Sequence, residues 1–281
     1  MYNCQLFKYQ NSWQLRIYDF PIVENEKLDK NSQIFTNDQF DLAEHETDLS
    51  FLHDPDNKYC FDGRSQYISL NHSINKIFYY SRSVDWSDGW FVTLTFNPDQ
   101  VDSFDYRSCV DCLRKFLDSL KRYDNTIKYL FVPEKHKSGR FHFHGLLSSV
   151  DFIRDDVVVF SGHCFGFDRI YNFRRFWKFG FSTLSKIKSS AAVQRYITKY
   201  TTKELLNDTK YQHRYFVSQN IEGAEIKKFN VNGDELFRNL VSSDLVSFIN
   251  TDGNYNRVKY IELKNSEKVL QYICSCAILR L

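Results

Sequence analysis

The sequence is poor in proline and glycine, with 4 and 10 of them in 281 residues. Values this low exclude collagen-like and low-complexity disordered chains. No apolar run reaches the roughly 18 residues that a membrane-spanning helix needs. The first residues also lack a basic stretch followed by an apolar one. We therefore expect no secretory signal and no membrane partner.

The seven cysteines do not form a regular framework. An odd number without regular spacing predicts reduced thiols, so we expect the protein to act in a cytoplasm. Cys109 and Cys112 are three residues apart, which places them on one face of a helix. A structural zinc site is the alternative, although no second pair with this spacing follows.

Aromatic residues are abundant, with 26 Phe and 18 Tyr, as expected for a folded protein with a sizeable core. The net charge of +2 is unevenly distributed. Residues 1–60 hold 5 Lys and Arg against 11 Asp and Glu, whereas residues 101–210 hold 20 against 12. The middle of the chain is thus the part that can meet a polyanion, unless its basic residues only solvate helix faces.

Strand and helix patterns alternate in the middle of the chain. Residues 90–98, WFVTLTFNP, have a period of two, which predicts a strand with one apolar face and one face carrying hydroxyls. Residues 102–122 show an apolar stripe with helical spacing, with Asp102 or Ser103 as the expected cap. Residues 127–134 predict another strand.

Further patterns follow along the chain. A short turn near Ser138 predicts an antiparallel hairpin between residues 127–134 and the following strand. Residues 168–180, DRIYNFRRFWKFG, predict a short basic helix that ends at Gly180. Residues 189–206 predict a stronger helix, because the segment begins with serine and contains no glycine or proline.

The segment FHFHG, residues 141–145, places two histidines in a strand pattern. Side chains alternate along a strand, so His142 and His144 share one face, about 7 Å apart, and can converge on one divalent cation. The predicted hairpin places Glu134 opposite His142. Such a ligand set leaves positions open for a phosphate oxygen, which favours Mg²⁺ or Mn²⁺. Two surface histidines without a chemical role are an equal alternative for this motif alone.

A second cluster, RYITKYTTKE, covers residues 195–204. Tyr196 and Tyr200 are four residues apart and therefore stand one turn apart on a helix, with Lys199 and Lys203 on the same side. A tyrosine hydroxyl can attack a phosphodiester when cations hold the developing charge. Taken alone, a tyrosine pair more often reflects core packing or coincidence, so its meaning depends on the histidines and Glu134.

Together these segments resemble the motifs of a known family. FVTLTFNP, then Glu134 eight residues before His142, then YITKY are similar in order and spacing to motifs I, II and III of the HUH family of rolling-circle replication initiators and relaxases. The tyrosine pair and FWKFGFSTLSKI at residues 176–187 look most like the initiators of microviruses and gokushoviruses. The resemblance covers residues 90 to about 220, and Phe141 stands where family members commonly have proline.

The resemblance implies a role for each matching residue. His142, His144 and Glu134 would hold a divalent metal, Mg²⁺ or Mn²⁺. Tyr196 and Tyr200 would be the nucleophiles, one to nick and the other to close the circle after a round of synthesis. Lys199 would position the phosphate or the metal.

Basic residues interleaved with aromatic ones suit single-stranded DNA, because cations follow the phosphates while rings stack on bases. A helix with core aromatics and a solvated basic face is the alternative. The residues that we expect to contact DNA are Arg140, Arg174, Arg175, Lys178, Arg195 and Lys203. The expected partners are a single-stranded DNA origin and the host helicase and polymerase, in the host bacterial cytoplasm.

We therefore expect an α+β fold with a central, mainly antiparallel sheet and flanking helices, similar to the HUH endonuclease and RRM/ferredoxin-like arrangement. The HxH strand would lie in the middle of the sheet and the tyrosine helix across its metal face. Residues 1–80 would be an N-terminal extension and residues 81–220 the catalytic core. Residues 221–281 would complete that domain or be appended to it.

The expected activity is site-specific nicking and rejoining of single-stranded DNA through a 5′-phosphotyrosine, which initiates rolling-circle replication of a small phage. One alternative is a transposase or plasmid relaxase of the same fold. Another is a nucleic-acid-binding module without catalysis, in which the histidines and tyrosines only stack or form hydrogen bonds.

Overall fold

Antiparallel strand pairs form most of the regular structure. The computed structural model describes residues 1–10, 12–23, 73–198, 209, 212–250, 258–264, 270–271 and 273. The chain divides into two compact units: the terminal unit, Met1–Glu46 with Gly223–Leu281, and the central unit, Thr47–Glu222. Every strand pair between described residues is antiparallel and helices pack on the sheets, so the expected α+β fold is confirmed.

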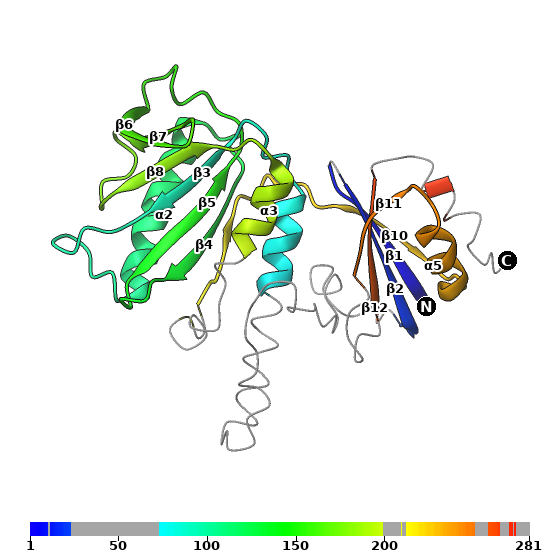
Figure 1. The fold of residues 1–281 in the computed structure, drawn as a ribbon. Helices are drawn as coiled ribbons and strands as arrows, with labels where there is room; N and C mark the ends of the chain where they lie inside the picture. The colour runs from blue at the N-terminus through cyan, green and yellow to red at the C-terminus, as the bar shows by residue number, and fades with distance from the viewer. Residues whose placement is uncertain are drawn as a thin grey trace, which may run out of the picture. The chain divides into compact units, whose positions relative to one another are not determined.

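The central unit is built on a sheet of order β6-β7-β8-β3-β5-β4-β9 (Figure 1). Its strands are β3 (Trp90–Leu94), β4 (Tyr129–Lys135), β5 (Phe141–Leu147), β6 (Val158–Phe165), β7 (Asp168–Phe173), β8 (Ser182–Lys186) and β9 (Phe216–Val217). The HxH strand, β5, lies inside the sheet between β3 and β4. An interior strand has neighbours on both sides, which fixes the direction of its side chains.

One face of this sheet is covered by α2 (Tyr106–Tyr123) (Figure 1). All members of the predicted apolar stripe are buried against the sheet: Val110, Leu113, Phe116, Leu117 and Leu120. The cap is Asp105, not Asp102 or Ser103, because its carboxylate accepts hydrogen bonds from the backbone of Arg107 and Ser108. The helix therefore begins a few residues later than the sequence predicted.

The opposite face of the central sheet is covered by a helix at residues 73–82 and by α3 (Ser190–Thr198). Val193 and Ile197 of α3 pack on Leu130, Val132 and Leu146 in a cluster that also holds Ile77. The tyrosine helix thus lies on the face of β5 that carries the histidines, as expected. The predicted continuation of this helix to residue 206 lies outside the described residues.

The prediction of a helix at residues 168–180 is wrong. Asp168–Phe173 is strand β7, which pairs with β6 along its length and with β8 at Tyr171. The aromatic and β-branched side chains of this segment favour a strand. The pairing with β6 makes this segment a strand, and Phe173 and Trp177 enter the core.

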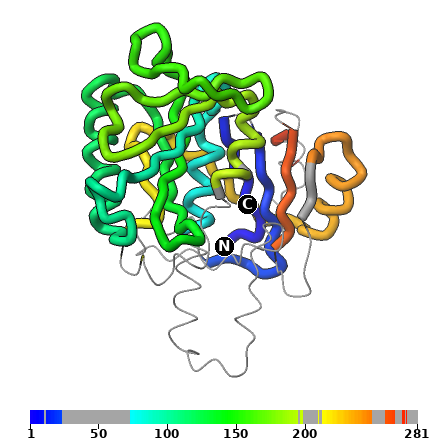
Figure 2. Tube along the Cα trace, turned by 60° about the vertical axis from the view of Figure 1, so that its left-hand side comes forward, coloured from blue at the N-terminus to red at the C-terminus, as the bar shows by residue number. Residues whose placement is uncertain are grey.

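The terminal unit joins the two ends of the chain in one sheet of order β10-β1-β2-β12-β11 (Figure 2). Its elements are β1 (Tyr2–Lys8), β2 (Trp13–Ile22), β10 (Glu225–Phe229), α5 (Gly233–Val241), β11 (Val246–Asn250) and β12 (Val258–Leu263). Leu236 and Leu240 of α5 pack on Leu15 and Ile261 in a core of its own. Each unit therefore has a separate hydrophobic core.

Cys109 and Cys112 are free thiols whose side chains belong to the core beneath α2. Burial raises the pKa of the Cys109 thiol to about 12, so it remains protonated. These positions act as small apolar core residues. Among the helices that the structure describes, none is long and apolar enough to cross a membrane.

Candidate active site

Strand β5 presents its two histidines because the alternate residues are held in the core. Phe141 and Phe143 are buried beneath α2 together with Tyr106. His142 and His144 consequently point to the face that α3 covers. Both phenylalanines together fix the strand, so a shift of register by one residue would place two imidazoles in the apolar core.

Gly145, which ends the FHFHG segment, lies beneath the ring of Phe131 on β4. A Cβ atom at this position would stand 2.1–2.5 Å from three atoms of that ring. Phe131 is itself fully buried. Glycine is required because only a backbone without a side chain allows the ring to lie against β5, the strand that carries the histidines.

The predicted cross-strand position of Glu134 is confirmed, since Glu134 pairs with His142 in the β4–β5 register. Its carboxylate, however, contacts the next histidine: Glu134 Oε2 and His144 Nε2 are 2.7 Å apart. The hydrogen bond from His144 lowers the pKa of Glu134, against a smaller opposing effect of burial. Glu134 is therefore an ionised carboxylate directed at an imidazole nitrogen.

The other nitrogen of the same ring has a partner on β3. Thr93 pairs with His144 in the β3–β5 register, and Thr93 Oγ1 lies 3.1 Å from His144 Nδ1. A hydroxyl can donate or accept, so it can satisfy either tautomer of the ring. Thr93 and Glu134 together fix the plane of the imidazole.

His142 is half-buried and stacks on His136 from the hairpin turn, with ring centroids 5.5 Å apart and planes inclined by 23°. Burial lowers the pKa of His142, although the carboxylate of Glu134 opposes this effect. The ring is thus held in its neutral form, the form that binds metal ions. His136 is exposed.

The expected metal ligands are only partly assembled. Two imidazoles and a carboxylate are donors that suit a divalent cation, and two of them, Glu134 and His144, are in direct contact with each other. His142 is turned toward His136. In the part of the chain that the structure describes, no three His, Cys, Asp or Glu side chains form a group that could hold one ion.

Tyr196 lies on α3 above the same face, and its side chain is 47% exposed. The ring of Phe91 on β3 connects it to His144. Phe91 lies 5.4 Å from the Tyr196 ring and 5.9 Å from the His144 ring, measured between centroids. A half-exposed tyrosine is therefore packed one aromatic ring away from the His144–Glu134 pair.

The remaining residues of the tyrosine motif are not placed. Tyr200, Lys199 and Lys203 lie outside the described residues. Arg195 belongs to α3, but only its backbone is described. Of the expected motif, the structure thus brings Tyr196 together with Glu134 and His144 on one face of the sheet.

The other expected DNA-contacting residues lie at the surface of the central unit. The Arg140 guanidinium covers the exposed ring of Phe104 at 5.3 Å, and that of Arg175 covers Phe176 at 5.6 Å. Lys178 is exposed, whereas Arg174 is bound to Asp156 at 3.2 Å. Two of the four thus combine a cation with an aromatic ring.

Two residues of the site were not expected from the sequence. Thr93 and Phe91 belong to the strand for which a hydroxyl-bearing face was predicted, and this face is the one turned toward the histidines. The alternation of the strand was therefore a signal for both residues. It did not show that both of them meet His144, because that depends on the pairing of β3 with β5, about fifty residues later.

Comparison with known proteins gives one finding for this part of the chain. Residues 89–205 match the model of a family of replication-associated proteins, the ORF2 family. The match covers less than half of the chain, and it includes β3 to β8, Glu134, both histidines and Tyr196. Neither the curated proteins nor the solved structures gave a match. The central unit is thus similar to replication-associated proteins, which is consistent with a replication initiator that has DNA as its partner.

Proposed function

We propose that the protein is a site-specific single-stranded DNA endonuclease and ligase that initiates rolling-circle replication. The observation that carries this proposal is the placement of Tyr196, through Phe91, beside the His144–Glu134 pair. The match of the same segment to replication-associated proteins supports it. We propose residues 81–220 as the catalytic core, with residues 1–80 and 221–281 attached to it.

In this proposal, Glu134, His142 and His144 hold a divalent cation, Mg²⁺ or Mn²⁺. Such an ion supplies Lewis acidity at a phosphate oxygen. The chain's own residues orient the ligands: Thr93 holds the ring of His144, and the core side chains of β5 keep both histidines on one face. Arg140, Arg175 and Lys178 carry the charge and the stacking partners that a single strand requires.

Tyr196 is the proposed nucleophile. Its phenolic oxygen attacks the scissile phosphorus and the bond to the 3′ oxygen breaks, which gives a 5′-phosphotyrosine and a 3′ hydroxyl. The phenol loses its proton to solvent, and the leaving oxygen takes one up. A host polymerase extends the free 3′ end, and Tyr200 serves the later strand transfer, with Lys199 beside the phosphate.

A labelled single-stranded origin oligonucleotide tests this proposal. With Mn²⁺ the wild type should form a covalent adduct that survives a denaturing gel, and EDTA or His142→Ala should abolish it. Tyr196→Phe combined with Tyr200→Phe should give no adduct, whereas the control Tyr123→Phe should behave as the wild type. An adduct from the double variant would show that the nucleophile lies elsewhere.

The single variants separate the initiator from its relatives. If Tyr196 nicks and Tyr200 acts later, Tyr196→Phe should form no adduct, and Tyr200→Phe should nick without completing strand transfer. Nicking and strand transfer that both survive Tyr200→Phe would favour a transposase or relaxase. Sequence-independent binding without any adduct would favour a binding module. A major capsid gene next to the coding sequence would support the proposed microvirus origin and action in the host bacterial cytoplasm.

A further inference from the structure

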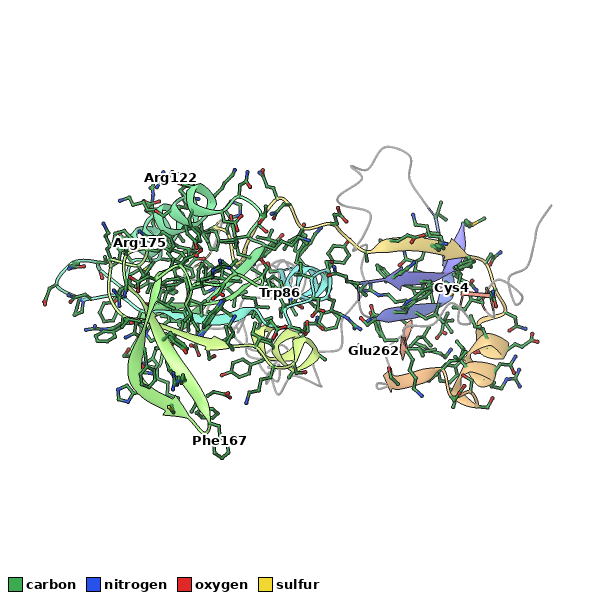
Figure 3. The ribbon with its side chains drawn as sticks, turned by 90° about the horizontal axis from the view of Figure 1, so that it is seen from above. Cys4, Trp86, Arg122, Phe167, Arg175 and Glu262 are labelled. Carbon is green, nitrogen blue, oxygen red and sulfur yellow. The ribbon has the colours of Figure 1, made fainter. Side chains whose placement is uncertain are left out.

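The hairpin formed by β6 and β7 extends beyond the sheet. Its base is anchored, because Val158 and Phe173 are paired with each other and belong to the core of the central unit. Only Tyr171 pairs with β8. Beyond the irregularity between Phe160 and Cys164, the two strands pair only with each other. Figure 3 shows Phe167 at the outer end of this hairpin, pointing away from the protein.

The outer part of the hairpin carries aromatic rings in water. Phe160 is 44% exposed, Phe165 is 81% exposed, and Phe167 is fully exposed. Single exposed apolar residues are common, but three phenylalanines on one two-stranded hairpin form a patch. A ring left in water contributes nothing to the stability of the fold. This arrangement therefore favours a function in binding.

The turn at the tip fixes the backbone that carries two of these rings, Phe165 and Phe167. Phe165 pairs with Asp168, so Gly166 and Phe167 form a two-residue loop. Gly166 has φ of +60°, the conformation that the tight turns of hairpins require at this position. Phe165 and Phe167 therefore stand on either side of a single glycine, on a short and defined loop.

The charges of the hairpin fit a polyanion. Its single carboxylate, Asp168, is bound by Lys188 at 2.8 Å. The Arg169 guanidinium lies 5.5 Å from the centre of the Phe160 ring. Arg175, which also covers a ring, follows two residues after β7. Cations beside exposed rings are the combination that binds the phosphates and the bases of a single strand.

We propose that the β6–β7 hairpin binds single-stranded DNA, with unpaired bases stacked on Phe165 and Phe167 and a phosphate on Arg169. The inference rests on the proposed function, from which it takes DNA as the partner. The order of the sheet places the base of the hairpin, where Tyr171 pairs with β8, three strands from β5, about 14 Å at the usual strand spacing. The tip with Phe165 and Phe167 lies further out along the hairpin. The hairpin would thus hold a part of the strand that lies several nucleotides away from the segment that is nicked.

Photocrosslinking to the full chain tests the contact directly. The probe is an oligo(dT) of about 30 nucleotides that contains 5-iododeoxyuridine, which crosslinks to aromatic side chains stacked on it. After irradiation and digestion, mass spectrometry should identify adducts on Phe165 or Phe167. Adducts confined to other parts of the chain would overturn the proposal.

Substitutions test how much the rings of Phe165 and Phe167 contribute to the affinity for DNA. Phe165→Ala combined with Phe167→Ala should weaken oligo(dT) binding about tenfold or more in fluorescence anisotropy, because two stacking surfaces are lost. The fold should be unaffected, since both rings are exposed. The matched controls are Val159→Ala on the same hairpin, which should bind as the wild type, and the double Phe→Tyr variant, which keeps both rings and should also bind. An unchanged dissociation constant in the alanine variant would overturn the proposal.

Further outcomes distinguish DNA binding by the hairpin from self-association of the chain and from the proposed nicking reaction. A shift from dimer to monomer in the alanine variant, with DNA binding unchanged, would overturn it in favour of a second copy of the chain as the partner. A covalent adduct on Tyr196 in the wild type, with unchanged DNA binding in the alanine variant, would overturn the proposal for the hairpin and leave the proposed nicking reaction intact. A tenfold loss of binding without any adduct in the wild type would support the hairpin contact and count against the nicking reaction.

Discussion

His144 is the residue on which the candidate site depends most, because both of its ring nitrogens have a partner. Glu134 contacts Nε2, and the Thr93 hydroxyl contacts Nδ1. If Nε2 gives up its proton to bind a metal ion, Nδ1 must carry one, and the hydroxyl then accepts instead of donating. Thr93 can serve both states of the ring without a change of position.

Thr93→Val should reduce nicking by roughly 10- to 100-fold, the usual effect of removing the partner of a metal-binding histidine. The valine keeps the shape of threonine but cannot pair with Nδ1. Nicking rates measured over a series of Mn²⁺ concentrations should show a higher requirement for the metal. Thr93→Ser should retain activity. Thr95→Val on the same face is the matched control, since Thr95 bonds to the backbone of Phe181. Equal effects of the two valine variants would show that Thr93 has no special role.

Gly145→Ala should destabilise the central unit by about 1–3 kcal/mol, because its methyl group would overlap the buried ring of Phe131. The midpoint of urea unfolding measures this change. Combining it with Phe131→Leu should recover part of the loss, since the smaller side chain frees space beside β5. If the double variant is simply as unstable as the sum of the two single variants, the proposed overlap is not the cause.

At the scale of elements, α2 depends on its cap. Asp105→Ala should destabilise the protein by about 1 kcal/mol, whereas Asp105→Ser should retain most of the stability. Hydrogen bonds from the Ser108 side chain and backbone lower the pKa of Asp105 below its ordinary value of 3.8. A lowered pKa in the folded state stabilises the protein above the unfolded value, and this contribution is lost as the pH falls through the folded value.

The difference in unfolding free energy between wild type and Asp105→Ala should therefore have its largest value at about pH 7 and be smaller at about pH 3. Urea unfolding at both values measures it. Because the carboxylate is largely exposed to solvent, the change should stay below 1 kcal/mol. A difference that is independent of pH would mean that the ionised form is not what caps the helix.

Local patterns predicted the elements of the site well. Periods of two and 3.6 residues identified β3, β4, β5, α2 and the start of α3, and a short turn was enough to place Glu134 opposite His142. Contacts between distant segments could not be predicted. Thr93 meets His144 across 51 positions, and β7 is a strand because it pairs with β6 and β8.

In the terminal unit, even less could be predicted from local patterns, because its contacts join segments that are still further apart in the sequence. Asn3 and Val231 exchange two hydrogen bonds across 228 positions, and no local pattern marks them as partners. The pattern VKYIELK at residues 258–264 indicates a strand, but not its neighbour. The assembly of the two chain ends into one sheet follows only from pairing over the full length of the chain.

At the scale of the whole molecule, the two separate cores predict two regions of stability. Leu113→Ala and Leu236→Ala each remove a fully buried side chain, the first in the central unit and the second in the terminal unit. Each should cost about 2–5 kcal/mol. Hydrogen exchange should become faster in β3–β8 for the first variant and in β1, β2 and β12 for the second. Faster exchange throughout the chain in both variants would show that the two units unfold as one.

The pairing of β2 with β12 also sets an order of events during synthesis. All strands of the central sheet lie before residue 218, so that sheet can form while the last part of the chain is still being translated. The terminal sheet must wait for Leu263. Until then β2 has a free edge, which is a site of aggregation, whereas β10 can already cover β1. A product released early would keep the edge of β2 open, so only chains translated through β12 gain the complete terminal sheet.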